Sequence, residues 1–273
     1  MFISTKKNLH QIYSEIKNLG DWGHYYNFNN KLITGYWESL YKETGRTVFF
    51  YKEPGFKVAK NYYEKEFQYP TGGKQFNKLF FIKDLISNSK SSVLDLGCND
   101  GMKSFFLERL GLKNITALDI REDCIVRARY IKKILGSKIN FDLLKNSADS
   151  KKMKFNQKYD YVLSFGILHH LIDHKQHIIN LNKISKKGFM LTTATDKEGV
   201  KLLLKRNFFT YKLREDSSNS FKAINGKYII PTKKEVLSYL SNINSKYVSE
   251  LVFLDSYYHS DFTRNFSYLF IKK

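Results

Sequence analysis

The chain has 273 residues, enough for one large domain or for a domain with a smaller appendage, and either can bury a substantial core without covalent staples. Its two cysteines, Cys98 and Cys124, are too few and too distant for a disulfide framework or a zinc site, so a reducing cytosol is the expected compartment. Lysine and arginine number 46 against 26 acidic residues, and the net charge of +20 favours polyanionic partners, although an AT-rich genome would impose the same lysine bias.

The start of the chain does not resemble a leader peptide. Lys6 and Lys7 are followed by polar residues, where a signal peptide would have an apolar core. No uncharged window approaches the length that crosses a bilayer. We therefore expect a basic, cytoplasmic protein without a membrane partner.

The first 85 residues differ in composition from the remaining chain. They are dense in tyrosine, phenylalanine and tryptophan, interspersed with lysine. They also lack the regular alternation of elements that follows. We predict a small N-terminal cap or lid over residues 1–85 and a larger domain over residues 86–273.

From about Ser91, short apolar runs alternate with helical stretches. The pattern predicts strands at 93–96, 115–120, 139–143, 159–165 and 188–195, and helices at 102–110, 122–135 and 174–184. Gly111 and Gly136 stand where the first two helices would end. Such alternation is typical of a parallel sheet covered by helices, so we predict a Rossmann-like, doubly wound α/β fold.

The alternation stops after Thr195 and then resumes. A basic insertion occupies 196–227, followed by a predicted strand at 228–230 and a helix that begins near Thr232. Two final strands are predicted at 247–254 and 266–271. Their connection is short, so we expect an antiparallel, reversed pair that closes the sheet.

The segment from Val93 to Gly101 places a predicted strand directly before a glycine turn that opens a helix. Glycine permits close approach of a ligand, and the backbone amides of such a turn are expected to be available to it. Asn99 lies between Gly97 and Gly101, so the GxGxxG fingerprint of dinucleotide-binding proteins is not met. Asp119 ends the next strand, where its carboxylate can accept both hydroxyls of a ribose.

The DxGxxxG spacing of this turn resembles motif I of the class I S-adenosylmethionine-dependent methyltransferases, and the resemblance covers roughly residues 85–273. It implies S-adenosylmethionine as cofactor and S-adenosylhomocysteine as product. The implied cofactor residues are Asp95, Gly97, Cys98, Asn99 and Gly101 in the turn, Asp119 at the ribose, Ile120 at the adenine face, Asn146 or Asp149 near the adenine amino group, and Ser164, Phe165 and Gly166 after the fourth strand.

Two histidines follow that fourth strand, in a loop that faces the transferred methyl group in this family. His169 or His170 would supply a base for a hydroxyl acceptor, because imidazole titrates near neutrality. The alternative is that one of them only caps or packs the loop. His174 and His177 have helical spacing but no cluster of acids or cysteines around them, so we expect surface residues and no metal site.

The basic insertion has two interpretations. Lys197, Lys201 and Lys205 share one face of a predicted helix, and Arg206 follows with several aromatic residues. Basic residues with interleaved aromatics suit phosphate contact and stacking, which would make the insertion a wall of the acceptor site. A solvated lysine face over a leucine run explains the pattern equally well.

A narrower resemblance covers two short segments. Residues 165–170 and 228–232 are similar to the bacterial tRNA wobble-uridine carboxymethyltransferases and to related sugar O-methyltransferases of polysaccharide loci. His169 stands where the tRNA family has a tyrosine that helps hold the extra carboxylate of its cofactor, so ordinary S-adenosylmethionine is expected here. The resemblance to this family suggests four acceptor-binding candidates, Lys57, Lys60, Tyr228 and Arg264. The basic insertion adds Lys205 and Arg206.

The sequence thus predicts O-methylation of a polar or anionic acceptor, such as a sugar, a nucleotide derivative or another small metabolite. An RNA methyltransferase or carboxymethyltransferase is the first alternative. A noncatalytic subunit of the same fold is the second, against which the intact Asp95, Gly97, Gly101 and Asp119 speak. A nicotinamide-dependent oxidoreductase is the third, and Asn99 in the middle glycine position disfavours it.

Overall fold

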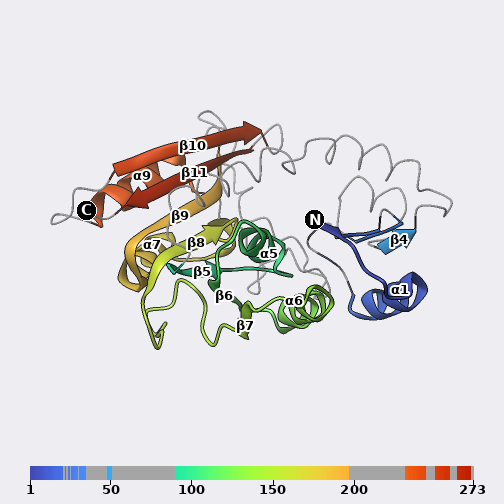
Figure 1. Ribbon diagram of the computed structural model, residues 1–273. Helices are drawn as coiled ribbons and strands as arrows, with labels where there is room; N and C mark the ends of the chain where they lie inside the picture. Colours follow the sequence, from blue (N-terminus) through green and yellow to red (C-terminus); the bar gives the residue numbers. More distant parts are fainter. Residues whose placement is uncertain are drawn as a thin grey trace.

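The computed structural model describes residues 1–20, 22, 24, 26–29, 31–34, 48–50, 90–196, 231–243, 250–258 and 263–271. Two sheets lie in these ranges, a large one formed after residue 90 and a small one near the N-terminus (Figure 1). None of the helices in the described ranges has both the length and the apolar character needed to cross a membrane.

The large sheet is mostly parallel. Its strands are β5 (Ser92–Leu96), β6 (Asn114–Asp119), β7 (Asn140–Leu143), β8 (Tyr159–Phe165), β9 (Ser185–Asp196), β10 (Glu250–Tyr258) and β11 (Thr263–Ile271), in the spatial order β10-β11-β9-β8-β5-β6-β7. β5 to β9 run parallel, and β11 is antiparallel to both β9 and β10. The predicted Rossmann-like fold is confirmed, but of the final two strands only β11 is reversed relative to the parallel five.

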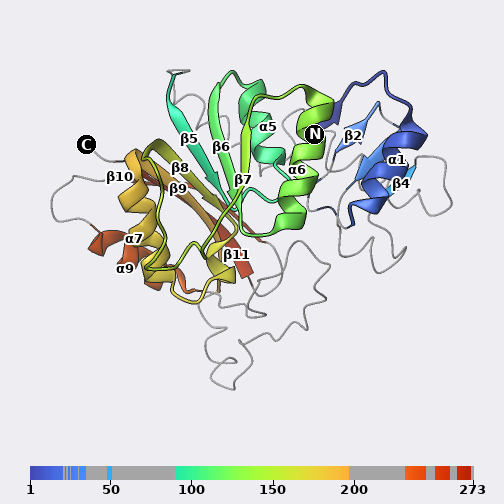
Figure 2. The same cartoon turned by 90° about the horizontal axis from the view of Figure 1, so that it is seen from below.

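Helices cover both faces of this sheet (Figure 2). They are α5 (Met102–Arg109), α6 (Glu122–Leu135), α7 (His174–Ile184) and α9 (Lys233–Asn242). α5 and α6 bury Phe105 and Ile131 in the apolar cluster on one face. α7 and α9 bury Ile178 and Val236 in a second cluster on the other face. The site described below lies at the carboxyl ends of the parallel strands β5, β6 and β8.

The chemistry of the helix ends explains most of the predicted boundaries. α6 ends at Gly136, which adopts the left-handed conformation with a φ of 64°. α9 begins after Thr232, whose hydroxyl accepts from the backbone N of Glu235 at 3.1 Å while the Glu235 carboxylate accepts from the backbone N of Thr232 at 2.7 Å. The strand predicted at 228–230 and the insertion beyond Asp196 lie outside the described residues.

The described N-terminal residues share a core with α5 and α6. They form α1 (Leu9–Asn18) and a sheet of β1 (Phe2–Ile3), β2 (Asn27–Phe28), β3 (Leu32–Thr34) and β4 (Val48–Phe50). Trp22, Tyr26 and Phe28 are fully buried in the cluster that also contains Phe105. The Tyr26 and Phe105 rings meet edge to face, with their centroids 6.4 Å apart. The division into a cap over 1–85 and a domain over 86–273 stays a prediction.

Candidate functional site

The candidate site lies where the strand order reverses, between β5 and β8. β5 pairs with β6 on one side and with β8 on the other, and all three are parallel, so their carboxyl ends meet at one edge of the sheet. Open α/β sheets bind their ligands outside the carboxyl ends of the strands at such a point. The glycine turn after β5, Asp119 at the end of β6 and the loop after β8 are therefore neighbours.

The five backbone amides of residues 97–101 are all bonded within the chain. Those of Gly97 and Cys98 donate to the carbonyl of Leu118 at 2.8 and 3.1 Å, and that of Gly101 donates to the carbonyl of Cys98 at 3.0 Å. The amide of Asn99 donates to the Asp119 carboxylate, and that of Asp100 to the Asn99 side chain, both at 2.8 Å. The expectation that these amides are available to a ligand is therefore wrong.

The two glycines of the turn are required by close packing. Gly97 has a φ of +76°, and a Cβ there would lie 2.2 Å from Cγ2 of Ile167. Gly101 has a φ of +86°, and a Cβ there would lie 2.6 Å from Cε1 of Phe141. The contact with Ile167 brings the glycine turn against the loop that carries the two histidines.

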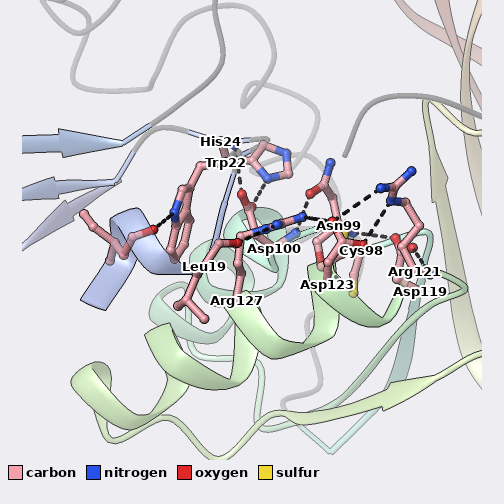
Figure 3. A network of polar contacts seen from close by, with 12 residues as sticks. Leu19, Trp22, His24, Cys98, Asn99, Asp100, Asp119, Arg121, Asp123 and Arg127 are labelled. Carbon is pink, nitrogen blue, oxygen red and sulfur yellow. Dashed lines mark hydrogen bonds and ion pairs between the residues drawn. The ribbon is translucent and has the colours of Figure 1, made fainter. Parts of the chain in front are cut away.

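Asp119 has its carboxylate beside the turn. It is 8% exposed, and its two oxygens accept from the backbone N of Asn99 at 2.8 Å and of Arg121 at 2.9 Å (Figure 3). Burial raises its pKa, while these two hydrogen bonds lower it. Each carboxylate oxygen has a second lone pair, so the group can still accept two ligand hydroxyls.

Asp95 faces α5. Its side chain is 1% exposed and accepts from the hydroxyl of Ser104 at 2.5 Å. Burial raises the pKa of Asp95, and the Ser104 hydrogen bond lowers it. Cys98 is likewise buried, with its thiol directed to the backbone carbonyl of Asn99 at 3.4 Å. Any contact of Cys98 with a cofactor would therefore come from its backbone.

The loop after β8 begins at Gly166, whose amide donates to the carbonyl of Thr192 at 2.7 Å on β9. A short 3-10 helix, η1 (Leu168–His170), follows and carries both predicted bases. The His169 and His170 rings lie 4.3 Å apart, tilted by 39°. Burial lowers the pKa of His170 to about 4, so this imidazole is neutral near pH 7.

His174 and His177 are buried, so the expectation that they are surface residues is wrong. His177 is fully buried; its Nε2 lies 2.9 Å from the Ser164 hydroxyl and its Nδ1 lies 3.2 Å from the carbonyl of Ala148. Burial lowers the pKa of His177 to about 4, so the neutral ring joins α7 to β8. Ser164, a predicted cofactor residue, is fully buried, and its hydroxyl is hydrogen-bonded to His177.

The two adenine candidates differ in their surroundings. Asp149 accepts from the backbone N of Ile172 and of Asp173, both at 2.9 Å, and from the Ser147 hydroxyl. Burial raises the pKa of Asp149, but these hydrogen bonds hold it below its usual value. Asn146 is exposed after β7 and is the candidate whose side chain remains accessible. Ile120 is half-buried after β6.

The acceptor-binding candidates cannot be assessed from the described residues. Lys57, Lys60, Lys205, Arg206 and Tyr228 lie outside them. Arg264 lies on β11, paired with Thr195 of β9.

Sequence reasoning missed three residues around the turn. His24 contacts the Asp100 carboxylate, and the Tyr26 hydroxyl donates to the Asp100 carbonyl at 2.7 Å. Nζ of Lys103 lies 5.2 Å from the centroid of the Phe165 ring, beside the carboxyl end of β8. Lys103 had a signal, because it lies in the first turn of the helix that follows the glycines. His24 had none, because it is 76 residues from its partner in sequence.

A protein-family comparison matches residues 87–244 to the family described as "Methyltransferase domain". Among curated proteins, a ubiquinone biosynthesis O-methyltransferase from Hydrogenovibrio crunogenus is 29% identical over 136 residues, covering 50% of this chain and 52% of that protein. A tRNA U34 carboxymethyltransferase from Campylobacter hominis is 25% identical over 120 residues, covering 43% and 38%. The chain thus spans about half or less of the length of these relatives.

Solved structures share the fold at low identity. The N-terminal domain of EvdMO1, crystallised with S-adenosylhomocysteine, has a TM-score of 0.64 at 14% identity, with 98% of both chains covered. Magnesium protoporphyrin IX methyltransferase from Synechocystis PCC 6803, also with S-adenosylhomocysteine, has a TM-score of 0.51 at 15% identity, covering 82% of this chain and 96% of that one.

Proposed function

This chain belongs to the methyltransferase domain family, and from that premise we propose that it transfers a methyl group from S-adenosylmethionine to a hydroxyl of a small polar or anionic acceptor. The observation that carries the proposal is the pairing of Asp119 with the amide of Asn99 at the point where the strand order reverses. This geometry presents a carboxylate to a ribose at the edge where such sheets bind ligands.

The residues of the turn fit a nucleoside better than a dinucleotide. A pyrophosphate needs donated backbone amides, whereas those of residues 97–101 are already used within the chain. A ribose needs only acceptors, which Asp119 supplies. This disfavours a nicotinamide-dependent oxidoreductase. It also supports a catalytic subunit over a noncatalytic one, because the turn and its acid are intact.

The chemistry divides between the cofactor and the chain. When bound, S-adenosylmethionine supplies a methyl group on a sulfonium that is already electrophilic. The turn, Asp119 and the exposed Asn146 would hold the adenosyl part, and the loop after β8 would position the acceptor oxygen. A hydroxyl acceptor would lose its proton to His169 or His170, whose ring centroids lie 4.3 Å apart.

RNA is the second candidate acceptor. The net charge of +20 and the similarity to tRNA U34 carboxymethyltransferases favour it. His169 stands where the carboxymethyltransferases have a tyrosine, and this difference favours transfer of a methyl group over transfer of a carboxymethyl group. We retain the small acceptor as the first proposal, with residues 1–85 as a cap, residues 86–273 as the catalytic domain and 196–227 as an insertion beside the acceptor.

One experiment separates these proposals. The protein is incubated with S-adenosylmethionine labelled in its methyl group and with cell extract fractionated into small metabolites, glycans and RNA. Label in the metabolite or glycan fraction supports the proposal, and label in RNA supports the alternative acceptor. The absence of both labelled product and calorimetric binding of S-adenosylhomocysteine would overturn the enzymatic assignment.

A further inference from the structure

Asp100 is a buried acid inside the glycine turn, and its partners come from the N-terminal segment. Its side chain is fully buried. One carboxylate oxygen accepts from the backbone N of His24 at 3.0 Å, and the other contacts Nδ1 of the same residue. Figure 3 shows this pair beside Asn99. A buried carboxylate is costly unless it is paired, so the turn depends on His24 for this compensation.

Two hydrogen bonds link Asp100 to Asp119 through Asn99, so the position of Asp100 affects that of Asp119. Asn99 and Gly101, on either side, have positive φ angles of 52° and 86°. The amide of Asp100 donates to the Asn99 side chain, and the amide of Asn99 donates to the Asp119 carboxylate. A displacement of Asp100 therefore moves the amide that orients the proposed ribose acceptor.

A second tie holds the N-terminal segment in place. Arg127 on α6 is 1% exposed; its guanidinium donates to the carbonyl of Leu19 at 3.0 Å and to the Asp123 carboxylate at 2.6 Å. Trp22, between Leu19 and His24, is fully buried and donates to the carbonyl of Ile16 at 2.9 Å. Leu19 is thus tied to α6, while His24 and Tyr26 are tied to the glycine turn.

We propose that the His24–Asp100 contact couples two events, the packing of the N-terminal residues around His24 and Tyr26 against the glycine turn and the binding of the cofactor. His24 and Asp100 are positioning residues, because they act on the cofactor through Asn99 and Asp119. The proposal rests on the proposed function, because it assumes that the turn holds S-adenosylmethionine. Cofactor binding stabilises the turn in the shape that His24 also requires, so each event favours the other.

The test compares three variants by calorimetry with S-adenosylhomocysteine. His24→Ala should weaken binding at least tenfold. His24→Asn should restore affinity to within about threefold of wild type, because its amide nitrogen takes the place of the ring Nδ1. His10→Ala, an exposed histidine on α1, is the matched control and should bind as wild type. In turnover assays, His24→Ala should raise the KM for the cofactor and leave kcat at saturation nearly unchanged.

A second measurement uses the unaltered protein, in case His24→Ala does not fold. Saturating S-adenosylhomocysteine should slow amide hydrogen exchange at Tyr26, Asn27 and Phe28 as well as in residues 97–101. Protection confined to 97–101, or wild-type affinity in folded His24→Ala, overturns the coupling. Absence of binding by the wild-type protein refutes the proposed function itself, so the two failures are distinguishable.

Discussion

At the scale of single residues, Asp119 combines support of the glycine turn with the proposed binding of a ribose. Two backbone amides hold its carboxylate, so the chain itself orients the proposed ribose acceptor. Such preorganisation lowers the cost of binding. It also means that the side chain supports the turn, and a test of its binding role must preserve its shape.

Asp119→Asn keeps the size of the side chain and one accepting oxygen, but it removes the charge and replaces the acceptor for one of the two backbone amides with an NH2 donor. We expect the affinity for S-adenosylhomocysteine to fall about 10- to 100-fold, because a hydrogen bond to a charged group contributes roughly 1.5–3 kcal/mol. Calorimetry measures the loss. Asp142→Asn on the neighbouring strand β7 is the control, since that carboxylate is 64% exposed. Equal affinity of the Asp119 variant and the control would refute the ribose assignment.

The predicted base is tested by His169→Ala and His170→Ala. At least one variant should lose roughly 10²- to 10⁴-fold in kcat while binding S-adenosylhomocysteine as wild type, because a base acts on the acceptor proton and not on the cofactor. The measurement is label transfer at saturating cofactor. Full activity in both variants would show that neither ring is the base.

The pH dependence of kcat tests whether His170 is the base. Burial lowers the pKa of His170 to about 4, so this ring stays deprotonated throughout the neutral range. If His170 is the base, kcat should be flat between about pH 6 and 8. If kcat instead falls as the pH is lowered, with a midpoint between pH 6 and 7, the result would exclude His170 as the base and favour a different group.

At the scale of elements, periodicity and cap residues predicted the helices and the parallel strands well, because both are local signals. The lengths of α6, β8 and α7 follow from them. The sequence did not reveal that α7 turns His174 and His177 inward. These two share a helical face with Ile178 and Leu181, an apolar stripe that could have indicated burial.

The sequence predicted part of the candidate site and missed another part. Parallel neighbouring strands bring their carboxyl ends together, so the proximity of Asp119 to the turn could be expected from chain order alone. The use of the turn amides within the chain could not, because it depends on the exact path of the backbone. The same holds for Asp100, whose partner His24 belongs to a segment without any periodic pattern.

The contact between α7 and β8 should make the protein sensitive to acid. The pKa of His177 is lowered from 6.5 to about 4 in the fold, so the unfolded chain binds the proton more readily between these values. Stability is therefore lost as the pH falls from 6.5 towards 4, by at most about 3 kcal/mol for this group. His170 acts in the same direction.

Thermal melts between pH 7.5 and 4.5 measure this loss. His177→Gln keeps an acceptor for the Ser164 hydroxyl but does not titrate, so its Tm should fall less steeply with acid than that of the wild type. His10→Gln, at an exposed position, should reproduce the wild-type slope. Identical slopes in all three proteins would show that His177 is not the source of acid sensitivity.

At the scale of the whole molecule, the charge of +20 is the property that the described site does not explain. Much of the basic sequence, including Lys205 and Arg206, lies outside the described residues. A diffuse positive field attracts a small anion and a polynucleotide alike. The two acceptors differ in the number of phosphates that they bring, and that number is measurable.

Salt dependence provides the measurement. A protein that makes 6–10 phosphate contacts loses about 10³- to 10⁵-fold in affinity between 50 and 200 mM salt, whereas a pocket for one small anion loses far less. For the proposed small acceptor we expect the KM to rise by less than about tenfold over this range. The affinity for S-adenosylhomocysteine, measured at both salt concentrations, controls for changes in the fold. A steep loss of acceptor binding with unchanged cofactor affinity would assign the positive charge to an RNA contact instead.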